Sequence, residues 1–179
     1  MAGRFAVERA DLVAAIAQVS GTASSATAGR RPVRPVAVLS FHGTADRLAR
    51  YEGGLPRTAT ARILIRRSRA TSVGVEDWAR FWVRVNGAQP QPVVESIPPD
   101  VTVRSWPGPT PGSDVVFYRI EGGGHTWPGS RWMVPRFLLG RVSRTIDATE
   151  IIWGFFGGQA RASSAARSAG PSAVPTVGL

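Results

Sequence analysis

The chain has 179 residues, no cysteine, and 22 basic against 12 acidic residues, for a formal net charge of +10. This length suits one domain with its own core, and the lack of cysteine excludes disulfides, thiolate metal sites and a cysteine nucleophile. No apolar stretch reaches the roughly 20 residues that a bilayer-spanning helix needs, and the N-terminus lacks the pattern of a signal peptide.

The positive charge alone would favour nucleic acid or an anionic membrane as a partner. Every basic residue is arginine, however, and Ala, Gly, Pro and Val are abundant, which is typical of GC-rich coding rather than of a phosphate-binding face. The densest basic run comprises Arg62, Arg66, Arg67 and Arg69. We expect this run to be a solvated surface, with neither nucleic acid nor a membrane as partner.

The first half of the chain contains the strongest strand signal. Residues 5–19 predict the end of a helix followed by a short buried strand, which ends at Ser20 and Gly21. A loop rich in Ser, Ala, Gly and Arg over 22–35 leads to residues 36–41, a nearly continuous apolar run. Such a run is typical of a strand covered on both faces of a parallel sheet. The sequence His-Gly-Thr-Ala-Asp follows directly at 42–46.

The second half repeats this pattern after an amphipathic helix. Helical spacing over 76–85 is stopped by Asn-Gly at 86–87, and the seven prolines of 88–111 allow only edge strands or a meander. Residues 115–120 form a second apolar strand, followed by Glu-Gly-Gly-Gly-His at 121–125. A terminal helix is predicted over 143–156, stopped by Gly157 and Gly158, and residues 159–179 are predicted to be a disordered tail.

The alternation of strands and helices predicts an α/β protein, whose sites form at the carboxyl ends of strands. Asp46 and His125 both follow strands. A buried carboxylate that orients a histidine is the acid and base pair of serine hydrolases, and acid before histidine is the order of α/β-hydrolases. The simpler alternatives are an Asx-turn at Asp46 and an ordinary loop histidine at 125. We expect His42 to pack and hydrogen-bond beneath the acid loop rather than to react.

Five segments carry a resemblance to a known family: residues 41–46, 51–54, 118–129, 146–150 and 153–156. Together they resemble the secreted polyhydroxybutyrate-depolymerase and feruloyl-esterase family. The resemblance implies the C-terminal half of an α/β-hydrolase fold over 1–158, with a mostly parallel sheet flanked by helices. It also implies a carboxylic-ester hydrolase that uses no cofactor or metal and acts on hydroxyalkanoate or aromatic acyl esters.

The same resemblance assigns roles to individual residues. It implies that Asp46 is the triad acid and His125 the general base, and that the glycines before His125 allow a tight approach to the substrate cleft. Trp127, Tyr51 and Trp132 are candidates for the walls of a substrate groove, with core or surface packing as the equal alternative. The family is secreted, but the chain lacks a signal peptide and the cysteines of its relatives, so its destination stays open.

The nucleophile of this family is missing from the sequence. No Gly-x-Ser-x-Gly motif occurs, and Ser20, Ser24 and Ser25 are not credible substitutes. We expect the sequence to begin just past the nucleophile elbow and to be inactive alone. The first strand would then expose an apolar edge that favours self-association. The rival hypotheses are a non-catalytic hydrolase remnant that binds a partner, and a basic nucleic-acid-binding module.

Overall fold

The computed structural model describes residues 1–56, 71–131 and 135–168. The basic run at 62–69 and Trp132 therefore lie outside the described residues. The elements in chain order are α1 (Ala2–Glu8), the short 3-10 helix η1 (Ala10–Leu12), β1 (Ala15–Val19), α2 (Ser25–Ala28), β2 (Ala37–Gly43), α4 (Val75–Asn86), β3 (Val93–Ile97), β4 (Val101–Trp106), β5 (Val115–Ile120), α5 (Arg136–Leu139) and α6 (Ala148–Ser168).

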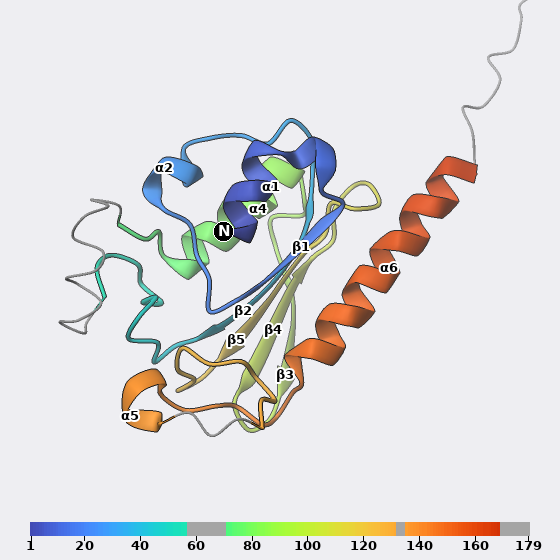
Figure 1. The fold of residues 1–179 in the computed structure, drawn as a ribbon. Helices are drawn as coiled ribbons and strands as arrows, with labels where there is room; N and C mark the ends of the chain where they lie inside the picture. The colour runs from blue at the N-terminus through green and yellow to red at the C-terminus, as the bar shows by residue number, and fades with distance from the viewer. Residues whose placement is uncertain (57–70, 132–134, 169–179) are drawn as a thin grey trace, which may run out of the picture.

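The five strands form one mixed sheet in the order β1-β2-β5-β4-β3 (Figure 1). The pairs β1-β2 and β2-β5 are parallel, and β4 pairs antiparallel with both β5 and β3. The predicted α/β architecture is thus confirmed, and the segment 88–111, for which edge strands or a meander are predicted, contains the antiparallel strands β3 and β4. Strand β1 lies at an edge of the sheet, where its outer backbone groups have no strand partner in the described chain. Self-association through this edge stays a prediction.

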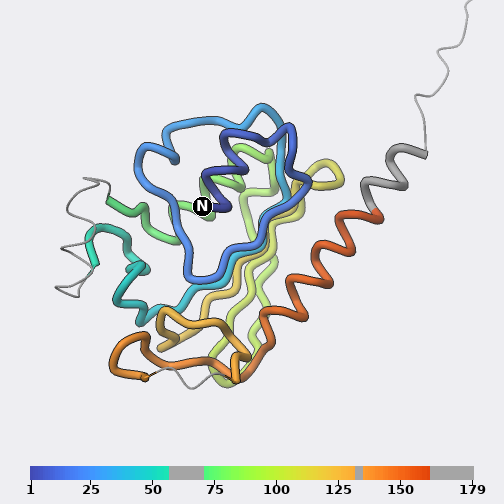
Figure 2. The backbone as a smooth tube through the Cα atoms, in the orientation of Figure 1, coloured from blue at the N-terminus to red at the C-terminus, as the bar shows by residue number. Residues whose placement is uncertain are grey.

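Helices cover both faces of the sheet and create two apolar cores (Figures 1 and 2). Helices α1 and α4 pack on one face, where Trp78 and Trp82 meet the even-numbered residues of β2 such as Val38. The first turns of α6 pack on the opposite face against Leu39 and Phe41. Every residue of β2 is consequently buried, as its continuous apolar run predicts.

The predicted helix 76–85 corresponds to α4, and the predicted strand 115–120 is β5. The prediction that Gly157 and Gly158 stop the last helix is wrong, because α6 passes through both and ends at Ser168. Residues 159–168, predicted to be disordered, are therefore helical. Each glycine costs only about 1 kcal/mol in a helix, and alanine, glutamine and arginine follow. None of the described helices, α6 included, is long and apolar enough to cross a membrane.

Asn86 joins the end of α4 to the starts of two central strands. Its side chain is buried, and its Oδ1 accepts the backbone N–H of Val36 at 3.2 Å. Its Nδ2 donates to the carbonyl oxygens of Val36 at 2.8 Å and Ser113 at 3.0 Å. Val36 precedes β2 and Ser113 precedes β5, so one amide side chain aligns the helix with both strands of the site.

We predict that Asn86→Leu lowers the free energy of unfolding by about 3 kcal/mol, because it leaves buried backbone groups of Val36 and Ser113 without partners. Urea denaturation followed by circular dichroism measures the change. The matched control is Gln89→Leu, the same kind of substitution at an exposed position, which is expected to change stability by about 0.5 kcal/mol or less. Equal effects of both substitutions would contradict the proposed role of Asn86.

Candidate active site

The loops that follow β2 and β5 leave the same edge of the sheet and touch each other. Gly43, the last residue of β2, pairs with Ile120, the last residue of β5. Beyond this pair, Ala45 N–H donates to Gly123 O at 2.9 Å. A Cβ at Gly43 would lie 2.2 Å from Gly123 O, so only glycine fits there. Parallel pairing and a glycine contact thus place the two loops side by side.

Asp46 is fixed on the first of these loops. Its side chain has no exposed surface. Its Oδ1 accepts the backbone N–H groups of Leu48 at 2.8 Å and Ala49 at 2.9 Å, which is the geometry of an Asx-turn. Its Oδ2 lies 2.8 Å from His125 Nδ1. The Asx-turn therefore coexists with the acid and histidine pair, and the two interpretations of Asp46 are not alternatives.

His125 is held on the second loop by backbone contacts. Its own N–H donates to Leu139 O at 2.6 Å, and Gly124 N–H donates to Arg141 O at 2.9 Å. A Cβ at Gly124 would lie 2.0 Å from Leu139 O. The tight approach that the glycines allow is therefore to the segment 139–141 and to Gly43. The family resemblance instead implies an approach to the substrate cleft.

The pairing with Asp46 decides which nitrogen of His125 carries the proton. A carboxylate can only accept hydrogen bonds, so Nδ1–H is the donor and Nε2 keeps its lone pair when the ring is neutral. The side chain is 37% exposed, whereas that of Asp46 is fully buried. An accessible basic nitrogen backed by a buried carboxylate can take a proton from a hydroxyl group or from water.

His42 lies beneath the acid loop, as predicted. Its side chain has no exposed surface, its Nε2 lies 2.7 Å from Ala49 O, and the same nitrogen is 3.5 Å from Asp46 Oδ2. Burial lowers the pKa of His42, against the smaller opposing effects of the Ala49 carbonyl and Asp46. The ring is therefore neutral at physiological pH, and Nε2 carries its hydrogen.

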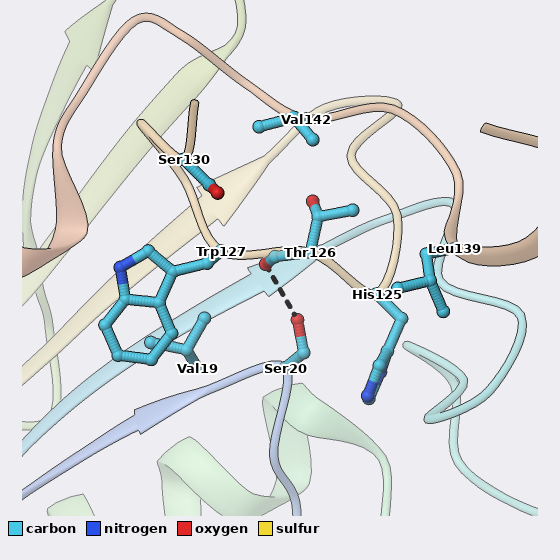
Figure 3. A pocket seen from close by; sticks show the side chains of 8 residues that line it. All are labelled: Val19, Ser20, His125, Thr126, Trp127, Ser130, Leu139 and Val142. Carbon is cyan, nitrogen blue, oxygen red and sulfur yellow. Dashed lines mark hydrogen bonds between the residues drawn. The ribbon is translucent and has the colours of Figure 1, made fainter. Parts of the chain in front are cut away.

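A pocket of about 230 Å³ adjoins His125 (Figure 3). Its lining residues are Val19, Ser20, His125, Thr126, Trp127, Ser130, Leu139 and Val142. Trp127 is 45% exposed and its Nε1–H donates to Thr149 Oγ1 at 3.0 Å. A second pocket of about 530 Å³ shares Trp127 and Ser130 with the first and is otherwise lined by Gly129, Arg131, Asp147 and Thr149. Trp127 thus stands between two pockets.

Ser20 lies in the pocket with His125, although its sequence context does not predict a nucleophile. It follows β1, which runs parallel to β2, so its strand end lies at the same edge of the sheet as Asp46. Its φ of 52° is in the left-handed region that non-glycine residues rarely adopt. Its hydroxyl donates to Thr126 O at 3.2 Å (Figure 3). The strand-end rule that selected Asp46 and His125 would have selected Ser20 as well.

Tyr51 is not among the lining residues of either pocket. Its hydroxyl donates to Glu76 Oε1 at 2.5 Å, and its ring lies near His42 and Phe117. Burial, together with the Glu76 carboxylate, raises the pKa of Tyr51. Within the described ranges no cluster of three or more metal-ligating side chains occurs.

Asp100 supports the segment that holds His125. Its carboxylate pairs with Arg141 Nη2 at 2.7 Å and accepts the hydroxyls of Ser143 at 3.2 Å and Thr145. Burial alone would raise the pKa of Asp100, but the hydrogen bonds from Thr145, Arg141 and Ser143 outweigh it and lower the pKa below 3.8. This carboxylate anchors the backbone to which Gly124 and His125 donate.

The fold and the site define an α/β protein with a buried acid and an accessible histidine at the carboxyl edge of its sheet. The chain is 30% identical over 156 residues to a protein of Nocardia uniformis subsp. tsuyamanensis named "Putative esterase NocK". The matched region covers 84% of this chain and 45% of that protein, so the chain spans less than half the length of this relative. The similarity supports an esterase-like family at this coarse level. No protein-family model and no solved structure matches.

We predict that Asp100→Asn lowers the free energy of unfolding at pH 7 by about 2 kcal/mol, the value of hydrogen bonds to a buried charge. Since the pKa of Asp100 is lower in the folded state than in the unfolded state, this contribution is present above about pH 4 and is lost as the pH falls through the folded-state pKa. Urea denaturation at several pH values between about 2 and 7 measures this contribution. The free energies of unfolding of the variant and the parent protein should converge at low pH.

The control for Asp100 is Asp11→Asn, because Asp11 pairs with Arg9 on the surface. An exposed ion pair contributes little to stability, so this variant should follow the parent protein at every pH. A constant difference between Asp100→Asn and the parent down to the lowest pH would show that the charge of Asp100 is not the cause.

We also predict that Gly43→Ala separates the two loops, because the new Cβ would overlap Gly123 O. The expected result is a lower melting temperature together with loss of the Asp46 to His125 hydrogen bond, observed as a change in the ring nitrogen shifts of His125. Gly158→Ala is the control, since no atom lies within 4 Å of its added Cβ. It should stabilise the protein slightly, by about 0.5–1 kcal/mol. Unchanged His125 shifts in Gly43→Ala would contradict the prediction.

Proposed function

We propose that this chain carries the acid and the base of a carboxylic-ester hydrolase. The observation that carries the proposal is the 2.8 Å contact between Asp46 Oδ2 and His125 Nδ1, which leaves His125 Nε2 accessible beside a pocket. The relation to a protein named as an esterase supports the same reaction class. The substrate is an ester, and the proposed reaction requires no metal or cofactor.

The proposed reaction has two halves. In the first, His125 Nε2 takes the proton of a serine hydroxyl while the serine oxygen attacks the acyl carbon of the ester. The proton then passes from Nε2 to the departing alcohol as the ester C–O bond breaks. In the second, Nε2 takes a proton from water while the water oxygen attacks the acyl carbon, and the same proton then passes to the serine oxygen as its bond to the acyl group breaks and the acid is released. Asp46 remains ionised and stabilises the imidazolium that forms in each half.

The serine in this proposal lies outside the given sequence. Two observations support this: the sequence contains no Gly-x-Ser-x-Gly motif, and the esterase-named relative is more than twice as long as the matched region. Ser20 is the serine of the described chain that lies in the pocket with His125, but its hydroxyl donates to Thr126 O. An open reading frame without such a motif just upstream of Met1 would contradict the proposed source of the nucleophile.

The finer substrate class is a hydroxyalkanoate polyester or a feruloyl-type aromatic ester, as the family resemblance implies. The two adjoining pockets on either side of Trp127 support a substrate whose chain extends from His125 past the indole into the second pocket. An exposed indole provides a flat apolar surface for an aromatic or aliphatic acyl chain. Comparing 3-hydroxybutyrate oligomers with methyl ferulate distinguishes the two classes.

The proposal predicts that this polypeptide alone hydrolyses p-nitrophenyl butyrate negligibly, whereas the longer protein that includes the upstream reading frame hydrolyses it. In the longer protein, His125→Ala and Asp46→Asn should each lower kcat by roughly 10³-fold or more, because the base or its orienting acid is lost. Asp77→Asn is the control, since it is the same acid-to-amide change at an exposed ion pair on α4. It should leave kcat unchanged.

Three results would change the proposal. Hydrolysis by this chain alone that disappears in Ser20→Ala would make Ser20 the nucleophile. Full activity of His125→Ala in the longer protein would exclude the proposed base. An inactive longer protein that remains monodisperse and melts cooperatively would favour the rival hypothesis of a non-catalytic, partner-binding remnant.

A further inference from the structure

We propose that His42 is a positioning residue of this site: its neutral imidazole holds the acid loop by hydrogen-bonding Ala49 O, and so keeps Asp46 Oδ2 directed at His125. This role rests on the ester-hydrolysis site proposed above. His42 itself is enclosed and does not reach the pocket, since its side chain has no exposed surface and it is absent from the pocket lining.

The first support is the position of His42 relative to the turn that orients Asp46. Asp46 Oδ1 accepts the N–H of Ala49, and His42 Nε2 lies 2.7 Å from the carbonyl oxygen of the same residue. Ala49 is therefore bound on one side by the carboxylate and on the other by the imidazole. Since His42 belongs to the interior strand β2, all of whose residues are buried, it connects the turn to the core of the sheet.

The second support is that Asp46 Oδ2 lies between two imidazoles. His125 Nδ1 is 2.8 Å away and His42 Nε2 is 3.5 Å away. The longer distance identifies Ala49 O as the main acceptor of the His42 proton and leaves Oδ2 for His125. If His42 were protonated, its charge would compete with His125 for the same carboxylate.

The surroundings of His42 keep its ring neutral. The rings of His42 and Tyr51 pack edge to face with 6.1 Å between their centroids, and the Tyr51 hydroxyl donates to Glu76. The titratable groups facing His42 are thus Asp46, His125 and Tyr51. The Gly21 backbone also lies near the ring and raises the pKa of His42, but by less than burial lowers it. No hydrogen bond to His42 Nδ1 of normal geometry occurs among the described residues, which suits the unprotonated nitrogen of a neutral ring.

Nuclear magnetic resonance can test this role without any turnover. The chain contains only two histidines, so correlations between ring nitrogens and carbon-bound protons are assigned with one His125→Gln variant. In the unmodified chain we expect opposite tautomers: Nδ1–H in His125 and Nε2–H in His42. In His42→Phe, which keeps an aromatic ring but removes the donor, the Nδ1 proton of His125 should exchange with water roughly tenfold faster, the factor for one lost hydrogen bond.

Two further variants separate positioning from mere stability. Phe41→Leu alters the neighbouring buried residue on the opposite face of β2, so it should lower the melting temperature but leave the His125 proton unchanged. His42→Gln restores an N–H donor and should return the exchange rate toward that of the unmodified chain. An unchanged His125 proton in His42→Phe would overturn the proposal.

The proposal remains testable if His42→Phe does not fold. Finding His42 as the Nδ1–H tautomer, or protonated at neutral pH, in the unmodified chain would overturn it without any variant. Because these measurements report the hydrogen bonds of the loop, they remain interpretable if the longer protein proves to hydrolyse no ester. The failure of the positioning role and the failure of the enzymatic proposal are therefore distinguishable.

Discussion

The parallel pairing of β2 with β5 is the constraint on which the site depends. Asp46 and His125 are 79 positions apart, and they meet because these neighbouring strands end at the same edge of the sheet. Strand pairing alone does not bring two loops into hydrogen-bond contact. The additional requirement is the absence of a side chain at Gly43, which lets its backbone lie against Gly123. The paired strands therefore place the Asp46 and His125 loops at the same edge of the sheet. The contact between Gly43 and Gly123 then brings the two loops within hydrogen-bond distance.

The sequence predicted the parts of this arrangement that are encoded in local patterns. Strand β2 is predictable because its residues are almost all apolar, and such a run fits a strand covered on both faces. Asp46 and His125 are predictable because both follow such strands. Their order and the strand-end rule predict that the two side chains lie near each other, whereas their hydrogen-bond contact also depends on the glycine at position 43. Ser20 obeys the same rule, but its Val-Ser-Gly segment resembles the family's strand end after the nucleophile elbow rather than the elbow itself.

The support of the site was not predictable, because it consists mainly of long-range contacts of the backbone. The segment 139–141 accepts hydrogen bonds from Gly124 and His125 through carbonyl oxygens, which every residue type possesses. The role of Asp100 was likewise missed, since its partners lie more than 40 positions away. The predicted end of α6 is wrong for a local reason: Gly157 and Gly158 are typical helix stops, but the helix formers that follow them continue the helix.

The two oxygens of Asp46 connect the folding of the acid loop with its chemistry. Oδ1 accepts two backbone N–H groups of its own turn, which fixes the rotation of the carboxylate, and Oδ2 consequently has one direction left, toward His125. A carboxylate without these hydrogen bonds would rotate, and either oxygen could then face the histidine in several orientations. In this loop the turn uses one oxygen and thereby assigns the other to the histidine. The local interaction that seemed a simple alternative to a functional role is therefore what makes that role geometrically possible.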